Sequence, residues 1–157
     1  MKAVRQVLGP LVALAFAGLL AASLPARAAE RPMAPSDASL RATEWTSIRA
    51  AIGAQRKALI AGDGNKALSY ASPGIRDQFG TPEVFLAMVR SAYAALLTAR
   101  YTEFLEGAVI DGLVIQPLRL IAPDNTVQVA LYTMEKQPDG RWKIAGCVLA
   151  PSTVQAA

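Results

Sequence analysis

The sequence of 157 residues contains no histidine. A Ser-His-Asp triad, a Cys-His pair and an imidazole proton shuttle are therefore excluded, because each of them requires a histidine ring. Zinc and haem sites with histidine ligands are excluded for the same reason. No acidic stretch has the spacing of a calcium-binding loop. We expect neither a metal nor a cofactor.

Cysteine is also scarce. Cys147 stands alone, so the chain cannot form an intramolecular disulfide bond. It lies within the apolar run 144–149, which favours a buried apolar role over that of a thiol available to another molecule. A single domain of this length buries enough apolar surface to fold without covalent cross-links.

The first 28 residues have the pattern of a secretory signal peptide. Lys2 and Arg5 give a positive start, an apolar run covers 11–24, and residues 26–28 have the small side chains of a cleavage site. We expect an exported protein, periplasmic rather than fully secreted, with no membrane association after cleavage. An uncleaved anchor is the alternative, although the run is short for a membrane span of roughly 20 residues.

The charge of the mature chain excludes a nucleic-acid partner. Lys and Arg outnumber Asp and Glu by 16 to 12, but Lys2, Arg5 and Arg27 belong to the signal peptide. The remaining basic residues are scattered among acidic ones, whereas phosphate binding requires clusters of Lys and Arg.

Helical spacing dominates the first half of the mature chain. Residues 29–42 have no apolar period and are expected to be a flexible N-terminus. From Thr43 onward, apolar residues and Gln55 recur three or four positions apart, which predicts a first helix that ends at Gly62.

Two more helices are expected before residue 100. Residues 65–71 suit a short second helix, and Thr81-Pro82-Glu83 is a strong start for a third helix that runs to about Ala99. The segment 75–80 between them is expected to be a turn or a short helical piece.

Beyond Arg100 the pattern changes to alternation and β-branched residues, which predicts four strands. Their short connections require antiparallel pairing, and the alternation buries one face of the sheet. Pro117 cannot donate a ladder hydrogen bond, so it marks an edge position or a bulge in a curved sheet. The expected strands cover 101–109, 113–121, 126–136 and 141–149.

Three helices followed by a curved four-stranded sheet give an α+β domain over residues 43–150, with a tail at 151–157. This order resembles the cone-shaped, cystatin-like domains of the nuclear transport factor two-like superfamily. The sequence marks that carry this resemblance are Ala61-Gly62-Asp63 with Ala67 beyond it, and the stretch Asp139-Gly140-Arg141-Trp142-Lys143-Ile144.

A narrower resemblance, over about residues 48–149, is to a bacterial family catalogued as Domain of Unknown Function 4864. It implies the fold but no activity, and no catalytic motif of the superfamily's enzymes transfers to this chain. The residues that carry it are Ser72-Pro73, Phe79-Gly80, Phe85, Met88-Val89, Tyr93, Gln116, Tyr132 and Trp142-x-Ile144-x-Gly146-Cys147.

Polar residues on apolar faces are the candidate ligand contacts. Tyr93 lies on the apolar stripe of the third helix, Gln116 interrupts an apolar strand and Tyr132 lies in the middle of another. The alternative for the tyrosines is a core role with local partners for their hydroxyls, and for Gln116 a buried amide that the core satisfies.

Three further candidates lie in or near turns. Asp63 could act as a proton acceptor if it were buried, but a Gly-Asp-Gly sequence favours a turn or a helix cap. Arg76 and Gln78 belong to a polar cluster without apolar period, where binding residues are common, although a solvated turn has the same composition.

We favour a non-catalytic exported domain that binds a small apolar ligand between helices and sheet, or an envelope protein on the sheet. One alternative is an isomerase- or lyase-type enzyme that transfers a proton through Asp63 or a tyrosine. The other is a structural homodimer that pairs through the outer face of the sheet.

Overall fold

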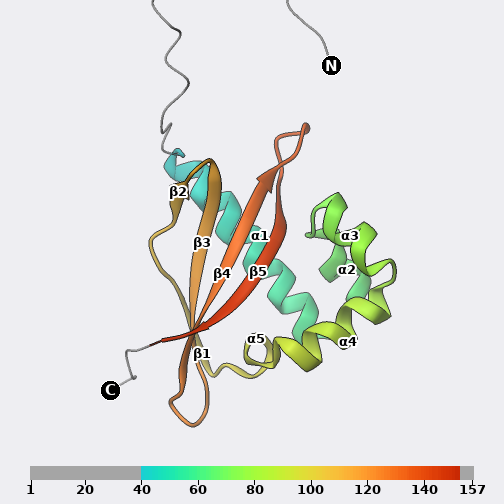
Figure 1. Cartoon of the computed structure of the whole chain (residues 1–157), viewed down its shortest axis with the longest axis vertical. Coiled ribbons are helices and arrows are strands. Elements are labelled where there is room, and N and C mark those ends of the chain that lie inside the picture. Colours follow the sequence, from blue (N-terminus) through green and yellow to red (C-terminus); the bar gives the residue numbers. More distant parts are fainter. Residues whose placement is uncertain (1–39, 153–157) are drawn as a thin grey trace, which may run out of the picture. The chain divides into compact units, whose positions relative to one another are not determined.

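The computed structural model describes residues 40–152, which form helices packed against an open antiparallel sheet of five strands (Figure 1). The expected α+β class is confirmed, whereas the expected numbers of three helices and four strands are wrong. The elements in chain order are α1 (Ala42–Ile60), α2 (Gly64–Ser69), α3 (Pro73–Phe79), α4 (Pro82–Ala92), α5 (Ala94–Thr98), β1 (Tyr101–Phe104), β2 (Ala108–Ile110), β3 (Leu113–Ile121), β4 (Val127–Lys136) and β5 (Trp142–Pro151).

The predicted signal peptide, 1–28, and most of the expected flexible segment, 29–42, lie outside the described residues. The same holds for the tail beyond Ser152. Within residues 40–152, no helix combines the length and the apolar character needed to cross a membrane.

Helix α1 has the predicted apolar stripe. Ile48 and Ile52 are fully buried, and Leu59, two turns further on, is nearly so. At the start of the helix, Glu44 accepts a hydrogen bond from the backbone N–H of Arg41 (3.1 Å) and another from Lys136 Nζ of β4 (2.8 Å). The bond from Lys136 is the main reason that the pKa of Glu44 lies below its usual value.

The predicted third helix is two helices, because the backbone leaves the helical conformation at Tyr93 (φ −128°, ψ 32°). Helix α4 starts as expected, with Thr81 Oγ1 accepting from the backbone N–H of Val84 (3.3 Å) and Pro82 in the first turn. The segment expected to be a turn or a short helical piece belongs to α3, which the Ser72 side chain caps.

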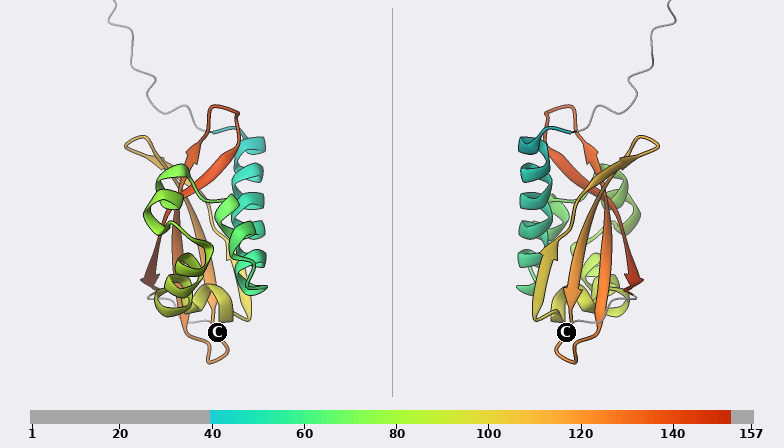
Figure 2. Two further views of the ribbon diagram at one scale, coloured as in Figure 1. Left: turned by 90° about the vertical axis from the view of Figure 1, so that its right-hand side faces the viewer. Right: turned by 90° about the vertical axis from the view of Figure 1, so that its left-hand side faces the viewer.

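The sheet has the order β1-β3-β4-β5, and β2 also pairs with β3. All neighbouring strands are antiparallel, as predicted. The helices gather on one face of the sheet, and its other face is left uncovered by them (Figure 2). An irregularity in the register lies between Thr133 and Met134 of β4, opposite β5.

The first predicted strand is split in two opposite Pro117. Phe104 pairs with Leu118 and Ala108 pairs with Ile115, so three residues of the edge chain face two residues of β3. Leu105 N donates to Pro117 O (3.1 Å), whereas Pro117 has no N–H to return. Pro117 was expected at an edge position or at a bulge. The edge position is wrong, because β3 lies between β1 and β4, and the irregularity lies in the edge chain opposite Pro117.

Gly107, within this break, lies directly against the indole ring of Trp45 on α1. A Cβ atom built on Gly107 would overlap several atoms of the ring. The edge chain can pass this close to α1 only where a residue has no side chain.

The core consists of two apolar clusters that α1 connects. The sheet cluster packs Ile48 and Ile52 of α1 against β3, β4 and β5. The helix cluster packs Ala58 and Leu59 of α1 against α2 and α4. Gln55 lies on α1 between the two sets of residues.

The open edge of β5 is covered at Ile144 by the segment between α2 and α3. Ala71 forms a parallel bridge with Ile144. Ser72 N donates to Ile144 O (2.8 Å), and Ile144 N donates to Tyr70 O (2.9 Å). Both backbone groups of Ile144 at this edge are therefore paired within the molecule.

We expect Gly107→Ala to lower the free energy of unfolding by about 1–3 kcal/mol, because the added methyl group must displace the Trp45 ring. Gly53→Ala is the matched control, since nothing lies within 4 Å of its Cβ position in the middle of α1. It should raise stability by about 0.5–1 kcal/mol through helix propensity. Urea denaturation of both variants tests this, and the same sign for both would contradict the packing described.

Candidate functional site

A cavity of about 330 Å³ lies where the two apolar clusters meet. Helices α1, α3, α4 and α5 and strands β4 and β5 all contribute to its wall. Most of the wall is apolar and includes Leu59, Ile75, Phe79, Phe85, Val89 and Leu96. Its polar side chains are those of Gln55, Gln78, Tyr93 and Tyr132.

Tyr132 reaches this wall from the middle of β4, where alternate residues face the helices. Its side chain is 1% exposed, and its hydroxyl has no hydrogen-bond partner among the described residues. Burial raises the pKa of Tyr132 above its ordinary value, and the neighbouring Cys147 adds to the shift. The hydroxyl therefore keeps its proton and remains a hydrogen-bond donor.

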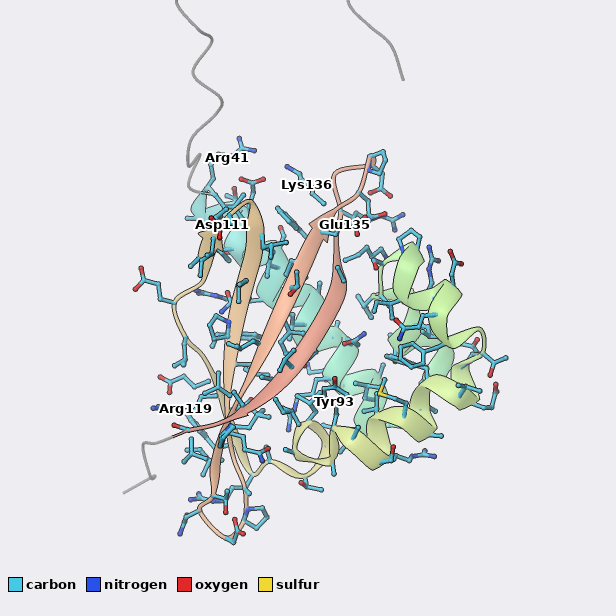
Figure 3. The ribbon with its side chains drawn as sticks, in the orientation of Figure 1. Arg41, Tyr93, Asp111, Arg119, Glu135 and Lys136 are labelled. Carbon is cyan, nitrogen blue, oxygen red and sulfur yellow. The ribbon has the colours of Figure 1, made fainter. Side chains whose placement is uncertain are left out.

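Tyr93 connects the helices to the edge strand. Its ring lines the cavity at the junction of α4 and α5, and its hydroxyl donates to Cys147 O of β5 (2.8 Å). Figure 3 shows Tyr93 between the sheet and these helices. The break that separates α4 from α5 thus places a hydrogen bond across one side of the cavity.

Gln55 is a cavity residue that the sequence did not single out as a contact. It is 4% exposed, and its Nε2 donates to Ala67 O (3.2 Å), which links α1 to α2. The available signal was an amide at a core position of the apolar stripe of α1, where a hydrocarbon side chain is the usual choice.

Cys147 also lines the cavity and was not proposed as a contact. It is half-buried and lies directly across the β4–β5 ladder from Tyr132. Burial raises the pKa of its thiol from 9.0 to about 12. The thiol is therefore neutral and a poor nucleophile at ordinary pH.

Gln116 lies outside the cavity, although it is the cross-strand partner of Tyr132. It is fully buried, and its amide is fully used by bonds to the sheet, to the edge chain and to α1. Nε2 donates to Leu105 O (2.8 Å) and to Pro117 O (2.9 Å), and Oε1 accepts from Arg49 Nε (3.2 Å). These bonds hold the chain together at the break between β1 and β2.

The three candidates near turns lie at different places. Asp63 is exposed and caps α2, with Oδ1 accepting from the backbone N–H of Lys66 (2.9 Å). Arg76 is exposed on α3 and is not part of the cavity wall. Gln78 is exposed on the same helix and does line the cavity. The structure therefore brings together Tyr93, Tyr132 and Gln78 of the six predicted residues.

The cavity wall carries no ionisable acid or base of the Asp, Glu, Lys or Arg type within residues 40–152. Arg56 is near enough to act on the pKa of Tyr132, but its guanidinium is already bound. Nε donates to Leu96 O (2.7 Å) and Nη2 to Ala99 O (3.2 Å), at the C-terminal end of α5. Across the same residues, no three His, Cys, Asp or Glu side chains are grouped so as to hold a metal ion.

A larger hollow of about 580 Å³ lies between α1 and the start of β5. It contains two basic side chains, both of which have partners. Arg141 pairs with Asp139, and Lys143 Nζ donates to Ser69 O. Its other polar side chains are those of Ser47, Ser69, Tyr70 and Trp142, and none of them has a buried atom without a hydrogen-bond partner.

Comparison with protein families gives one match, which covers residues 41–157, to a family described as Domain of unknown function (DUF4864). No curated protein and no solved structure shows a significant match to the chain.

The buried thiol predicts a pH dependence of stability. Because the pKa of Cys147 is higher in the folded chain than the 9.0 of the free thiol, its contribution is complete below pH 9 and is lost as the pH rises towards about 12. Relative to Cys147→Ala, the wild type should lose about 1.4 kcal/mol of unfolding free energy per pH unit in that range. Denaturation curves from pH 8 to 10.5 test this, and a constant difference between the two proteins would contradict it.

Proposed function

The chain belongs to the DUF4864 family, whose description names no activity, and we propose that it is a non-catalytic exported domain that binds a small apolar ligand between helices and sheet. The ligand occupies the cavity where the two apolar clusters meet. The volume of about 330 Å³ falls at the lower end of the range for small-molecule sites, roughly 300–1,000 Å³.

The Tyr132 hydroxyl is the observation that carries this proposal. A buried polar group without a partner costs about 1–3 kcal/mol, so folded proteins satisfy nearly all of them. Tyr132 lines an apolar cavity and has no partner among the described residues. A bound molecule with one polar atom would supply the missing hydrogen bond.

Binding accounts for the cavity better than proton transfer. Asp63, the proposed base, is an exposed helix cap outside the cavity, and no carboxylate of residues 40–152 lines the wall. A tyrosine with a raised pKa gives up its proton less readily than a free phenol, so Tyr132 is a weak general acid.

We also propose the finer fold assignment, a cone of the nuclear transport factor two-like kind. It is supported by helices that precede the strands, by their position on one face of the sheet, and by the interruption opposite Pro117. Export to the periplasm is proposed from the leader sequence alone.

A second candidate function, a homodimer or a protein complex through the uncovered face of the sheet, has one observation in its favour. Leu131 and Val148 are cross-strand partners on β4 and β5 and are 37% and 62% exposed. Such adjacent apolar side chains on an outer face are typical of a protein contact.

Native mass spectrometry of the protein purified from its own cell envelope tests ligand binding. We expect an added mass that disappears on denaturation and a polypeptide mass that starts at Ala29. Met88→Trp, which fills the cavity, should abolish the added mass, whereas Ala87→Trp on the exposed side of the same helix should retain it. An added mass that survives in Met88→Trp would contradict this location for the ligand.

Light scattering after size exclusion tests the second candidate. If the outer face pairs, the wild type should have twice the monomer mass, and Val148→Lys should reduce it to the monomer. Ile60→Lys, at an exposed apolar position on α1, is the matched control and should leave the dimer intact. A wild type that stays monomeric at high concentration rules out the homodimer.

A further inference from the structure

The polar side chains of the cavity wall are all uncharged, and Tyr132 is the one among them whose buried donor has no partner within residues 40–152. From this we infer that the ligand is an uncharged molecule with an apolar body and a single acceptor oxygen, such as a ketone or ester carbonyl, which accepts a hydrogen bond from the Tyr132 hydroxyl. This inference rests on the proposed function and specifies the chemistry of the same site.

A hydrogen-bond acceptor on the ligand fits the site because the described residues of the cavity wall provide no acceptor for the Tyr132 hydroxyl. Tyr132 carries one O–H donor, which no residue of 40–152 receives. The hydroxyl of Tyr93 already donates to Cys147 O, and Gln55 Nε2 already donates to Ala67 O. The amide of Gln78 is exposed, so water can satisfy it. A buried donor without a partner is rarer than an acceptor with a spare lone pair, so the group that the site requires is an oxygen that accepts.

The absence of charge follows from the surroundings of the cavity. A carboxylate moved out of water without a cation at hand costs several kcal/mol. The guanidinium of Arg56, which acts on the pKa of Tyr132, is bound to two backbone carbonyl groups at the end of α5 and does not line the wall. A cationic ligand is equally disfavoured, because no carboxylate of the described residues lines the wall. A ligand that carries its charge into the cavity, such as a short carboxylate or amine, is therefore disfavoured.

Two other buried polar atoms lack a partner, but neither points to this site. Arg119 Nε belongs to a side chain whose guanidinium already pairs with Glu103. Gln128 Oε1 lies by a separate hollow of about 220 Å³ that includes Asp124 and Thr126. Tyr132 alone, of the residues that the structure describes, combines an orphaned buried hydroxyl with the apolar cavity.

The test uses three ligands of one size on the mature protein: cyclohexyl methyl ketone, ethylcyclohexane and cyclohexanecarboxylate. Their dissociation constants are measured at pH 7 from the shifts of the backbone amide signals of residues 145–147, which line the cavity. We expect the ketone and the hydrocarbon to bind and the carboxylate to bind at least tenfold more weakly than the ketone.

Tyr132→Phe then isolates the hydrogen bond. The variant deletes only an atom without a partner, so it should fold with undiminished stability. It should raise the dissociation constant of the ketone about threefold to tenfold and leave that of the hydrocarbon unchanged. Tyr93→Phe is the matched control, because its hydroxyl is already bound, and it should not change the ratio of ketone to hydrocarbon affinity.

The outcomes separate the two levels of the proposal. Equal effects of Tyr132→Phe on ketone and hydrocarbon, or a carboxylate that binds as tightly as the ketone, overturn the assigned ligand chemistry and leave an apolar binding site. No shift of the amides at 145–147 with any of the three ligands overturns the proposed function itself.

Discussion

The packing of α1 across the sheet is the constraint on which the rest of the domain depends. Ile48 and Ile52 fill the sheet cluster, and one to two turns later Ala58 and Leu59 fill the helix cluster. A single straight element thus serves two cores that diverge from each other. The cavity lies where these two clusters meet, and Gln55 of α1 is part of its wall.

The side of the cavity opposite α1 depends on how the chain between α4 and α5 meets the sheet. The backbone turns at Tyr93, and the hydroxyl of this residue binds the edge strand at Cys147 O. The same residue therefore ends a helix, joins two layers and lines the cavity. Gln116 also has more than one role, because its amide hydrogen bonds replace the backbone ladder where β1 and β2 separate.

Periodicity was sufficient to predict the helical and strand halves, and the short connections predicted the antiparallel sheet. The missing N–H of Pro117 indicated an irregularity, but not that it would lie in the neighbouring edge chain. Periodicity could not predict the division of the long helix, because no Gly or Pro stands at the break. The residue there is Tyr93, whose hydroxyl binds a strand distant in sequence. Nor could periodicity separate the candidate residues that line the cavity from those that do not. Alternation places Gln116 and Tyr132 on one face of the sheet, but the path of the edge chain decides that the Gln116 amide binds Leu105 and Pro117. Gln55 and Cys147 were not predicted as contacts, because residues distant in sequence together form the cavity wall. The ligand role of these residues stays a prediction.

The segment from Tyr70 to Ser72 limits aggregation between molecules of this protein, because it covers part of the edge of β5. An exposed strand edge is a template on which another molecule can extend the sheet, and this is a common start of aggregation. Because both edge groups of Ile144 are already bound to Tyr70 and Ser72, a second chain could join β5 there only after this segment had detached. The connection between α2 and α3 therefore also hinders intermolecular extension of the sheet at Ile144.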